Sequence, residues 1–304
     1  MKNIHIEARS ARDINNQIDR VHQNLGYVSG KVNLLEVRDL LKLDLKYYRL
    51  DDPGLVDEVV HKLRVGAKQI IARPQLLLEA ARKFDLSALY LPDRKRIYID
   101  NDIPDLKKRW CESHEISHSL IPWHTEYMHG DNKATLSPTC HEIIEAEANY
   151  GGGRLLFPHK VFSDARQSSK MSLSLVKNIA TSFGNTITST LWRCVEQSEE
   201  ILFATIGGHP HNPKDGVKQI EYFIDSKMFA QQFTNISEEE IWSYLLSYCR
   251  TTKTGPLGQA QIQLIDINNE PHIFLIESFS NGHNVLTLGR WLSTAPTLVS
   301  TITT

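Results

Sequence analysis

Two histidines and a glutamate in the middle of the chain have the types and spacing of a metal site. They form the sequence His114-Glu115-Ile116-Ser117-His118, an H-E-x-x-H. Residues four apart lie on one face of an α-helix, so His114 and His118 can direct both imidazoles at one ion. Glu115 can then take a proton from zinc-bound water, whose pKa the metal lowers to about 7. The pattern predicts a zinc site, and a helix with two surface histidines is the simpler alternative.

A carboxylate further along the chain can supply the ligand that two histidines leave missing. A glutamate from another helix is a usual third protein ligand of zinc. The sequence offers Glu145-Ala146-Glu147-Ala148-Asn149. Two positions on a helix differ by about 200° around its axis, so Glu145 and Glu147 cannot share one face. Only one of the two can therefore face the histidines.

These two sequences resemble the paired motifs of the ImmA/IrrE family of metallopeptidases. That family combines H-E-x-x-H with E-x-x-A-N-x-F-A-x-x-L-L-x-P on the following helix. Here Glu145 to Asn149 match the start of the second motif, and Leu155 to Pro158 match its end. The resemblance covers residues 70–160 or so, and the two motifs, their order and their separation all agree.

The resemblance implies a role for each of these residues. It implies that His114, His118 and Glu145 bind Zn²⁺, and that Glu115 is the general base and acid of peptide hydrolysis. Asn149, four positions after Glu145, shares its face of the helix. We expect Asn149 to hydrogen-bond a ligand or its backbone.

Other polar residues near the motifs have weaker claims on the chemistry. We expect Glu147 and Glu142 either to hydrogen-bond a metal-binding side chain without binding the metal, or to lie on the surface. His124 is a candidate for orienting substrate or stabilising the oxyanion, but a structural or solvent-exposed histidine is the simpler interpretation. The candidates His129 and His141 rank no higher than His124, and Tyr150 is a still weaker candidate for the oxyanion.

Three glycines interrupt the second motif. Where the family has x-F-A after the asparagine, this chain has Tyr150-Gly151-Gly152, with Gly153 next. Each glycine inside a helix costs roughly 1 kcal/mol relative to alanine. The glycines therefore permit either a close approach of this helix to its neighbour or a flexible site, and the sequence leaves both open.

Cys111 and Cys140 lie beside the two motifs. A thiolate is a strong zinc ligand, so our hypothesis is that one of them, Cys140 rather than Cys111, takes the open coordination position and keeps the enzyme inactive. Replacing Cys140 by alanine would then raise basal proteolysis. A buried thiol is the simpler alternative, as it is for Cys194 and Cys249. No C-x-x-C pair or disulfide framework is present in the sequence.

Helices and a hairpin must position these residues. Two β-rich runs, Ser87–Leu91 and Arg96–Asp100, flank a turn-forming segment and predict a hairpin just before the H-E-x-x-H helix. Its free edge is a candidate for holding an extended peptide substrate, with an ordinary protected edge strand as the alternative. The helices expected before the hairpin cover residues 8–25, 32–50, 53–65 and 74–84.

After the second motif, the pattern changes from helices to strands. Gly184 is a plausible helix stop between two of the later helices. The expected helices cover residues 161–166, 172–182, 186–197, 226–233 and 238–249, and the strands 201–206, 219–224, 261–265, 272–276 and 284–288.

These elements predict an α+β protein with three parts. Residues 1–70 form an N-terminal helical region. For residues 71–198, which are mostly helical with a small β-hairpin or sheet, the family resemblance implies a zincin-like metallopeptidase domain. Residues 199–304 form a smaller α+β domain, which we compare with the GAF-like sensory domain of some relatives.

Composition excludes several classes of protein. With 41% hydrophobic and 23% charged residues, the chain can bury a core. We expect a soluble, cytoplasmic protein, because the N-terminus has no signal-peptide pattern and no segment is apolar enough to span a membrane. A net charge of -2 gives no overall basic footprint for nucleic acid, although residues 1–110 are mildly basic.

The resemblance implies a regulatory zinc endopeptidase with a protein substrate. The expected substrate is a DNA-binding repressor of the helix-turn-helix type, or an antitoxin-like partner, whose cleavage derepresses a stress, defence or mobile-element response. Single-stranded DNA or a small ligand is the expected activator. The alternative is a metal-containing transcription regulator or binding protein without proteolytic activity. The intact Glu115 argues against a binding protein with a structural zinc, because such a site needs no general base.

Overall fold

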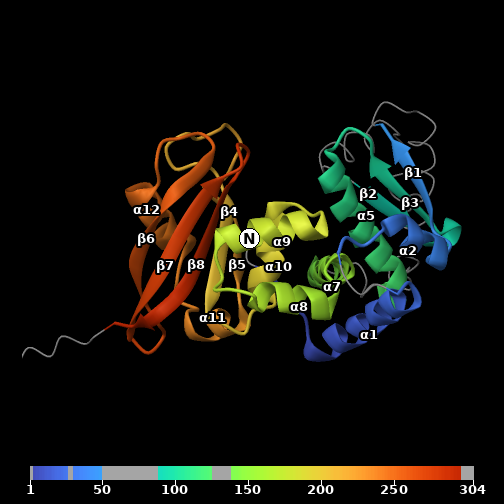
Figure 1. Cartoon of the computed structure of the whole chain (residues 1–304), viewed down its shortest axis with the longest axis horizontal. Coiled ribbons are helices and arrows are strands. Elements are labelled where there is room, and N and C mark those ends of the chain that lie inside the picture. Colours follow the sequence, from blue (N-terminus) through green and yellow to red (C-terminus); the bar gives the residue numbers. More distant parts are fainter. Residues whose placement is uncertain (1–2, 27–29, 50–87, 125–137, 296–304) are drawn as a thin grey trace, which may run out of the picture. The chain divides into compact units, whose positions relative to one another are not determined.

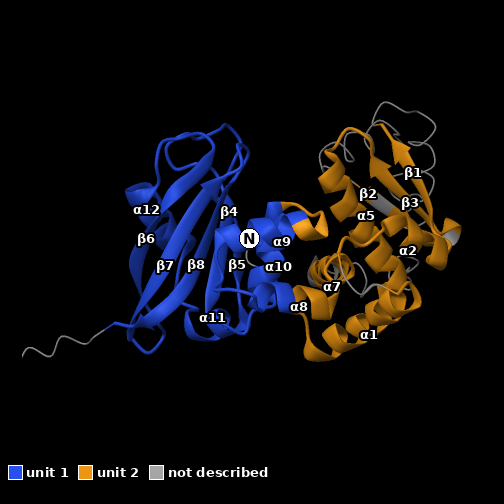
Figure 2. Ribbon diagram, in the orientation of Figure 1, with its two compact units in different colours: residues 1–5, 164–181, 187–304 blue, residues 6–163, 182–186 orange. Residues whose placement is uncertain are grey.

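The computed structural model describes residues 3–26, 30–49, 88–124 and 138–295 (Figure 1). The helices predicted over residues 53–65 and 74–84 lie outside this part. Packing divides the chain into two compact units (Figure 2). Residues 6–163 with 182–186 are called the HExxH unit here, and residues 1–5, 164–181 and 187–304 the sheet unit.

Two long helices that pack against each other form the centre of the HExxH unit. They are α5 (Asp105–Leu120) and α7 (Pro138–Leu156). Helix α1 (Ala8–Asn24) packs on α7 and buries an apolar stripe that includes Ile14 and Ile18, which confirms the helix predicted there. The expected N-terminal helical region therefore shares a core with the two motif helices.

A three-stranded sheet in the order β1-β3-β2 contacts α5. Strands β2 (Ala88–Leu91) and β3 (Arg96–Asp100) are antiparallel, with the short 3-10 helix η1 (Pro92–Arg94) between them. The predicted hairpin is thus confirmed. Strand β1 (Asp44–Tyr48) pairs with β3 in parallel, so β2 is an edge strand of the described sheet.

The helix predicted over residues 32–50 is wrong in its second half. Helix α2 (Leu34–Leu41) ends at Lys42, whose backbone φ of 56° is left-handed, and strand β1 follows. A left-handed residue ends the helical hydrogen-bond pattern. The crowded leucines favoured a helix, whereas the strand depends on pairing with β3, a partner that sequence periodicity does not reveal.

The sheet unit contains a five-stranded antiparallel sheet in the order β5-β4-β8-β7-β6. Its strands confirm the predicted ones and are β4 (Leu202–Gly207), β5 (Ile220–Asp225), β6 (Gly255–Ile265), β7 (Pro271–Ser280) and β8 (Val285–Thr294). Helices α11 (Lys227–Gln232) and α12 (Glu238–Tyr248) lie between β5 and β6 in the chain. The buried core includes the rings of Phe203, Phe223, Phe229, Phe233 and Phe274.

The helices predicted between the motifs and the large sheet are confirmed as α8 (His159–Gln167), α9 (Leu173–Phe183) and α10 (Ile187–Glu196). Gly184, with a left-handed φ of 64°, separates α9 from α10. Helix α10 packs on β4 and β5, which places it in the sheet unit. The boundary predicted near residue 198 followed the change in sequence pattern, and it differs from this division by packing.

The short segment of residues 182–186 is hydrogen-bonded to both α5 and α7. The side-chain oxygen of Asn185 accepts a hydrogen bond from Nε of Arg109 on α5 at 3.0 Å. The amide nitrogen of Asn185 donates to the carbonyl of Leu156, at the end of α7, at 3.5 Å. The chain therefore enters the HExxH unit after residue 181, contacts α5 and α7, and returns to the sheet unit at residue 187.

The mixed α+β class is confirmed, with two sheets and helices in both units. Among the described helices, none combines the length and apolar character needed to cross a bilayer.

Candidate metal centre

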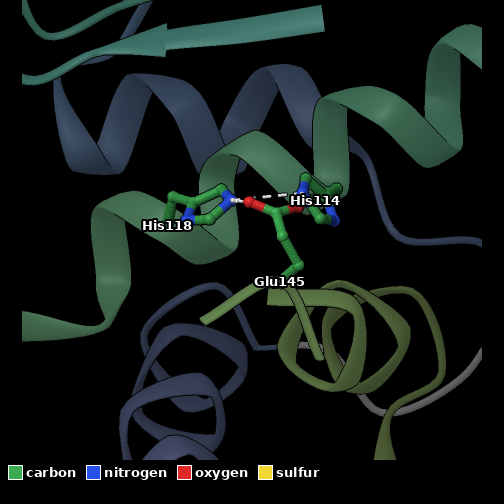
Figure 3. A group of neighbouring side chains, drawn as sticks. All are labelled: His114, His118 and Glu145. Atoms are coloured by element: carbon green, nitrogen blue, oxygen red, sulfur yellow. Dashed lines mark hydrogen bonds and ion pairs between the residues drawn. The ribbon is translucent and has the colours of Figure 1, made fainter. Parts of the chain in front are cut away.

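Three side chains of the HExxH unit direct nitrogen and oxygen atoms at one point (Figure 3). The Nε2 atoms of His114 and His118 are 3.1 Å apart. Glu145 brings one carboxylate oxygen to 3.2 Å from Nε2 of His114 and the other to 3.6 Å from Nε2 of His118. The structure thus brings together the three residues expected to bind the metal.

The spacing of these atoms suits zinc. Tetrahedral zinc with bonds of about 2.0–2.1 Å has its ligand atoms about 3.3 Å apart, close to the separations observed here. Two imidazoles and one carboxylate also form a donor set of catalytic zinc sites, which leave a fourth position open.

Close contact between α5 and α7 makes this arrangement possible. A Cβ atom on Gly152 would lie 3.1 Å from both Cα and the backbone nitrogen of His114. A Cβ atom on Gly151 would overlap the hydroxyl of Ser117. The glycines had two explanations, a close approach between helices or a flexible site. The structure supports the first, because α7 approaches α5 closely at Gly151 and Gly152.

Asn149 orients the ring of His114 from the far side. Its side-chain oxygen lies 3.0 Å from Nδ1 of His114. An amide oxygen only accepts, so Nδ1 carries the proton and Nε2 keeps the lone pair that a metal needs. The contact has the form expected for Asn149, one turn beyond Glu145.

Glu115 follows His114 on α5, and only 6% of its surface is exposed. Burial raises the pKa of its carboxyl group to about 7; His114 and the backbone N–H of Tyr90 oppose the rise, and the charge of Glu145 adds to it. A carboxyl group with a pKa near the working pH can both accept and release a proton. The bond from Tyr90 also places strand β2 directly beside Glu115.

His124 and Glu147 lie in the interior next to His118. A place near a ligand was one of the two expected for Glu147, but the sequence did not show that His124 would connect it to His118. His124 is fully buried, and its Nδ1 is 3.0 Å from Nδ1 of His118. Its Nε2 is 3.0 Å from a carboxylate oxygen of Glu147, which also accepts from the indole of Trp123 at 2.6 Å. His124 therefore does not face a substrate. The acidic Glu147 on the ligand helix was the only sequence signal for this cluster.

Most of the remaining candidates lie away from the three metal-facing groups. Cys111 is buried, burial raises its thiol pKa to about 11, and it is not among the grouped donors of the described residues. Tyr150 donates its hydroxyl to Asn15 on α1 at 3.1 Å, so the oxyanion role is not supported for it. Glu142 is exposed. The side chains of Cys140 and His141, and the whole of His129, lie outside the described part, so the Cys140 hypothesis stays a prediction.

An H-E-x-x-H helix paired with a glutamate-bearing helix defines the metallopeptidase class of site. Residues 67–194 match the IrrE N-terminal-like domain, a peptidase family, and this match confirms the resemblance of that region to the ImmA/IrrE family. No curated protein matches the sequence.

Among solved structures, the fold is similar to that of a Mycobacterium tuberculosis transcriptional regulator. The TM-score is 0.51 at 11% identity, over 95% of this chain and 89% of that chain. At this identity, the likeness concerns the fold alone.

Proposed function

We propose that the protein is a regulatory zinc-dependent endopeptidase. The observation that carries the proposal is the convergence of His114, His118 and Glu145 within 4.8 Å, with the buried carboxyl group of Glu115 on the same helix. A site that only stabilises the fold needs the ligands but not Glu115. The IrrE N-terminal-like domain supports the same class of protein.

The residues divide the chemistry between them. His114, His118 and Glu145 would hold Zn²⁺, which supplies polarisation of the substrate carbonyl and makes water nucleophilic near neutral pH. Glu115 takes the proton of the attacking water and delivers it to the leaving amine. Strand β2 lies against Glu115 through Tyr90, so its edge is a suitable place for an extended substrate to pair.

Replacing Glu115 by glutamine tests the proposal. Glutamine has the same shape but does not accept the proton, so we expect cleavage to fall by a factor of about 10²–10⁴. Zinc content and substrate binding should remain, because the three ligands are intact. On purified protein, metal analysis measures the zinc content and a gel-based assay measures cleavage.

Glu142→Gln is the matched control, because Glu142 is an exposed carboxylate on the ligand helix. It should cleave at the wild-type rate. If Glu115→Gln still supports cleavage or the cellular response, the alternative of a metal-containing regulator without proteolytic activity becomes the better explanation.

The proposed substrate is a helix-turn-helix repressor or antitoxin-like protein, as the family resemblance implies. The protein encoded beside this chain is the first to test. It should be cut when mixed with the zinc-loaded protein, and derepression of the genes that it controls should follow. An intact partner under every activating condition would refute this choice of substrate.

We propose the sheet unit as a GAF-like sensor of a small ligand or single-stranded DNA. In support, its antiparallel sheet, together with α9, lines a cavity of about 670 Å³ that includes Lys177, Tyr248, Arg250 and Glu277. A mixed-charge cavity of this size is suited to a small polar molecule. Cleavage that is independent of any added ligand or oligonucleotide would count against a sensor role.

A further inference from the structure

His118 begins a chain of hydrogen bonds that runs into the core of the HExxH unit. Its Nδ1 lies 3.0 Å from Nδ1 of His124, and Nε2 of His124 lies 3.0 Å from an oxygen of Glu147. Trp123 donates to that same oxygen at 2.6 Å. His118, His124 and Glu147 are 2%, 0% and 4% exposed, so solvent has almost no access to these bonds.

The donor at the outer end determines where the protons lie. An indole nitrogen only donates and a carboxylate oxygen only accepts, so Oε2 of Glu147 accepts from Trp123 and also from Nε2–H of His124. A neutral His124 then has its lone pair on Nδ1, which accepts from Nδ1–H of His118. This leaves the lone pair of His118 on Nε2, the atom that lies 3.6 Å from Glu145.

The opposite arrangement is incompatible with a metal ligand. If His124 carried protons on both nitrogens, Nδ1 of His118 would have to accept. A neutral His118 would then carry its proton on Nε2, where no metal could bind.

We propose that His124 and Glu147 are positioning residues, which hold His118 in the tautomer and ring orientation that zinc binding requires. The inference rests on the proposed zinc centre, but not on the identity of any substrate. Residues that orient a ligand histidine typically contribute 10- to 100-fold to metal affinity.

Removing the residue that orients each ligand histidine should reduce zinc affinity by different amounts for His114 and His118. His114 is oriented by Asn149, which is exposed, so water can replace the amide when it is removed. His118 is oriented inside the core, where an unpaired polar nitrogen has no water to bind. Loss of His124 should therefore weaken zinc binding more than loss of Asn149.

Zinc affinity of the full chain, measured by competition with a chromophoric chelator, tests the proposal. We expect His124→Ala to bind zinc about 10- to 100-fold more weakly and Asn149→Ala only a few-fold more weakly. His124→Asn should stay within about threefold of wild type, because its side-chain oxygen can accept from His118 in place of Nδ1. Cobalt absorption spectra should change with His124→Ala and be restored with His124→Asn.

His22 provides a matched control in the same unit. It is buried, and its Nε2 lies 2.9 Å from the carbonyl of Leu155, away from the metal-facing groups. His22→Ala should lower the melting temperature without changing zinc affinity. Wild-type affinity and spectrum in His124→Ala, or equal losses of affinity in His22→Ala and His124→Ala, would overturn the proposal.

Two further variants keep the test decisive if His124→Ala does not fold. Glu147→Gln removes the charge, and Trp123→Phe removes only the indole donor. Both should weaken zinc binding, and wild-type affinity in both would overturn the proposal. Failure of the proposed function looks different. A chain that cleaves no partner, but loses zinc affinity in these variants as described, contradicts only the peptidase reading.

Discussion

Glu145 and Glu115 are two glutamates at one centre with different surroundings. The side chain of Glu145 is 41% exposed and faces two imidazole nitrogens. Glu115 is buried beside them, and burial raises its pKa to about 7. When two carboxyl groups are in such different environments, they take different roles. For the proposed zinc centre, this supports charge neutralisation at the metal as the role of Glu145 and proton transfer as the role of Glu115.

At the same scale, His22 should make stability depend on pH. Burial lowers its pKa, and the bond to the Leu155 carbonyl opposes this only in part. The folded protein then binds the proton less readily than the unfolded chain, whose histidines titrate near 6.5. The contribution of His22 is therefore present above about pH 6.5 and is lost as the pH falls below it.

Urea unfolding of wild type and His22→Gln at pH 7.5, 6.5 and 5.5 checks this expectation. The free energy of unfolding should fall more steeply with acidification in wild type than in the variant. Because the other histidines are common to both proteins, the difference isolates His22. Equal pH slopes would show that His22 does not contribute.

Sequence reasoning at the residue scale found the groups that follow simple spacing rules. His114 and His118 share a helix face, and Asn149 follows Glu145 by one turn, so their contacts could be expected. His124 could not be placed in the same way. Its role depends on Glu147, a residue on another helix, and local spacing carries no information about which helices meet.

Among the elements, α5 and α7 show how backbone contact limits the geometry of the candidate metal centre. A methyl group on Gly152 would lie 3.1 Å from two backbone atoms of His114. A backbone, unlike a flexible side chain, cannot turn aside. The separation of the two ligand-bearing helices is therefore limited by this glycine.

Gly152→Ala should destabilise the protein, against the usual trend for a helix. Helix propensity alone predicts a gain of about 1 kcal/mol for alanine. Overpacking against His114 costs about 1–3 kcal/mol and should outweigh this gain, which leaves a net loss of up to about 2 kcal/mol and weaker zinc binding. Chemical denaturation and chelator competition measure the two effects, and a variant more stable than wild type would rule out the limiting contact.

The elements themselves were largely predictable, since most of them have a clear period. The amphipathic α1 and the strands of the large sheet have the hydrophobic periods of a helix and of strands. Strand β1 did not, because it forms only where β3 pairs with it and Lys42 turns the chain. The cost of three glycines in a helix also indicated that they serve a structural role. Only the contact of α7 with α5 showed that this role is close approach of the two helices.

On the scale of the whole molecule, the chain passes between its two units more than once. The crossings fall after residues 5, 163, 181 and 186. The sequence pattern suggested one boundary near residue 198, because composition changes there from helix to strand. Packing gives a different division, in which α10 belongs with the strands β4 and β5.

The segment of residues 182–186 limits how recombination can exchange one unit of this protein for another. Its neighbours on both sides belong to the sheet unit, while Asn185 is bound to α5 and to the end of α7. Neither unit is formed by one continuous stretch of the chain. A single recombination point therefore cannot exchange one unit for a homologous version without also splitting the other. We expect the two units to have evolved together.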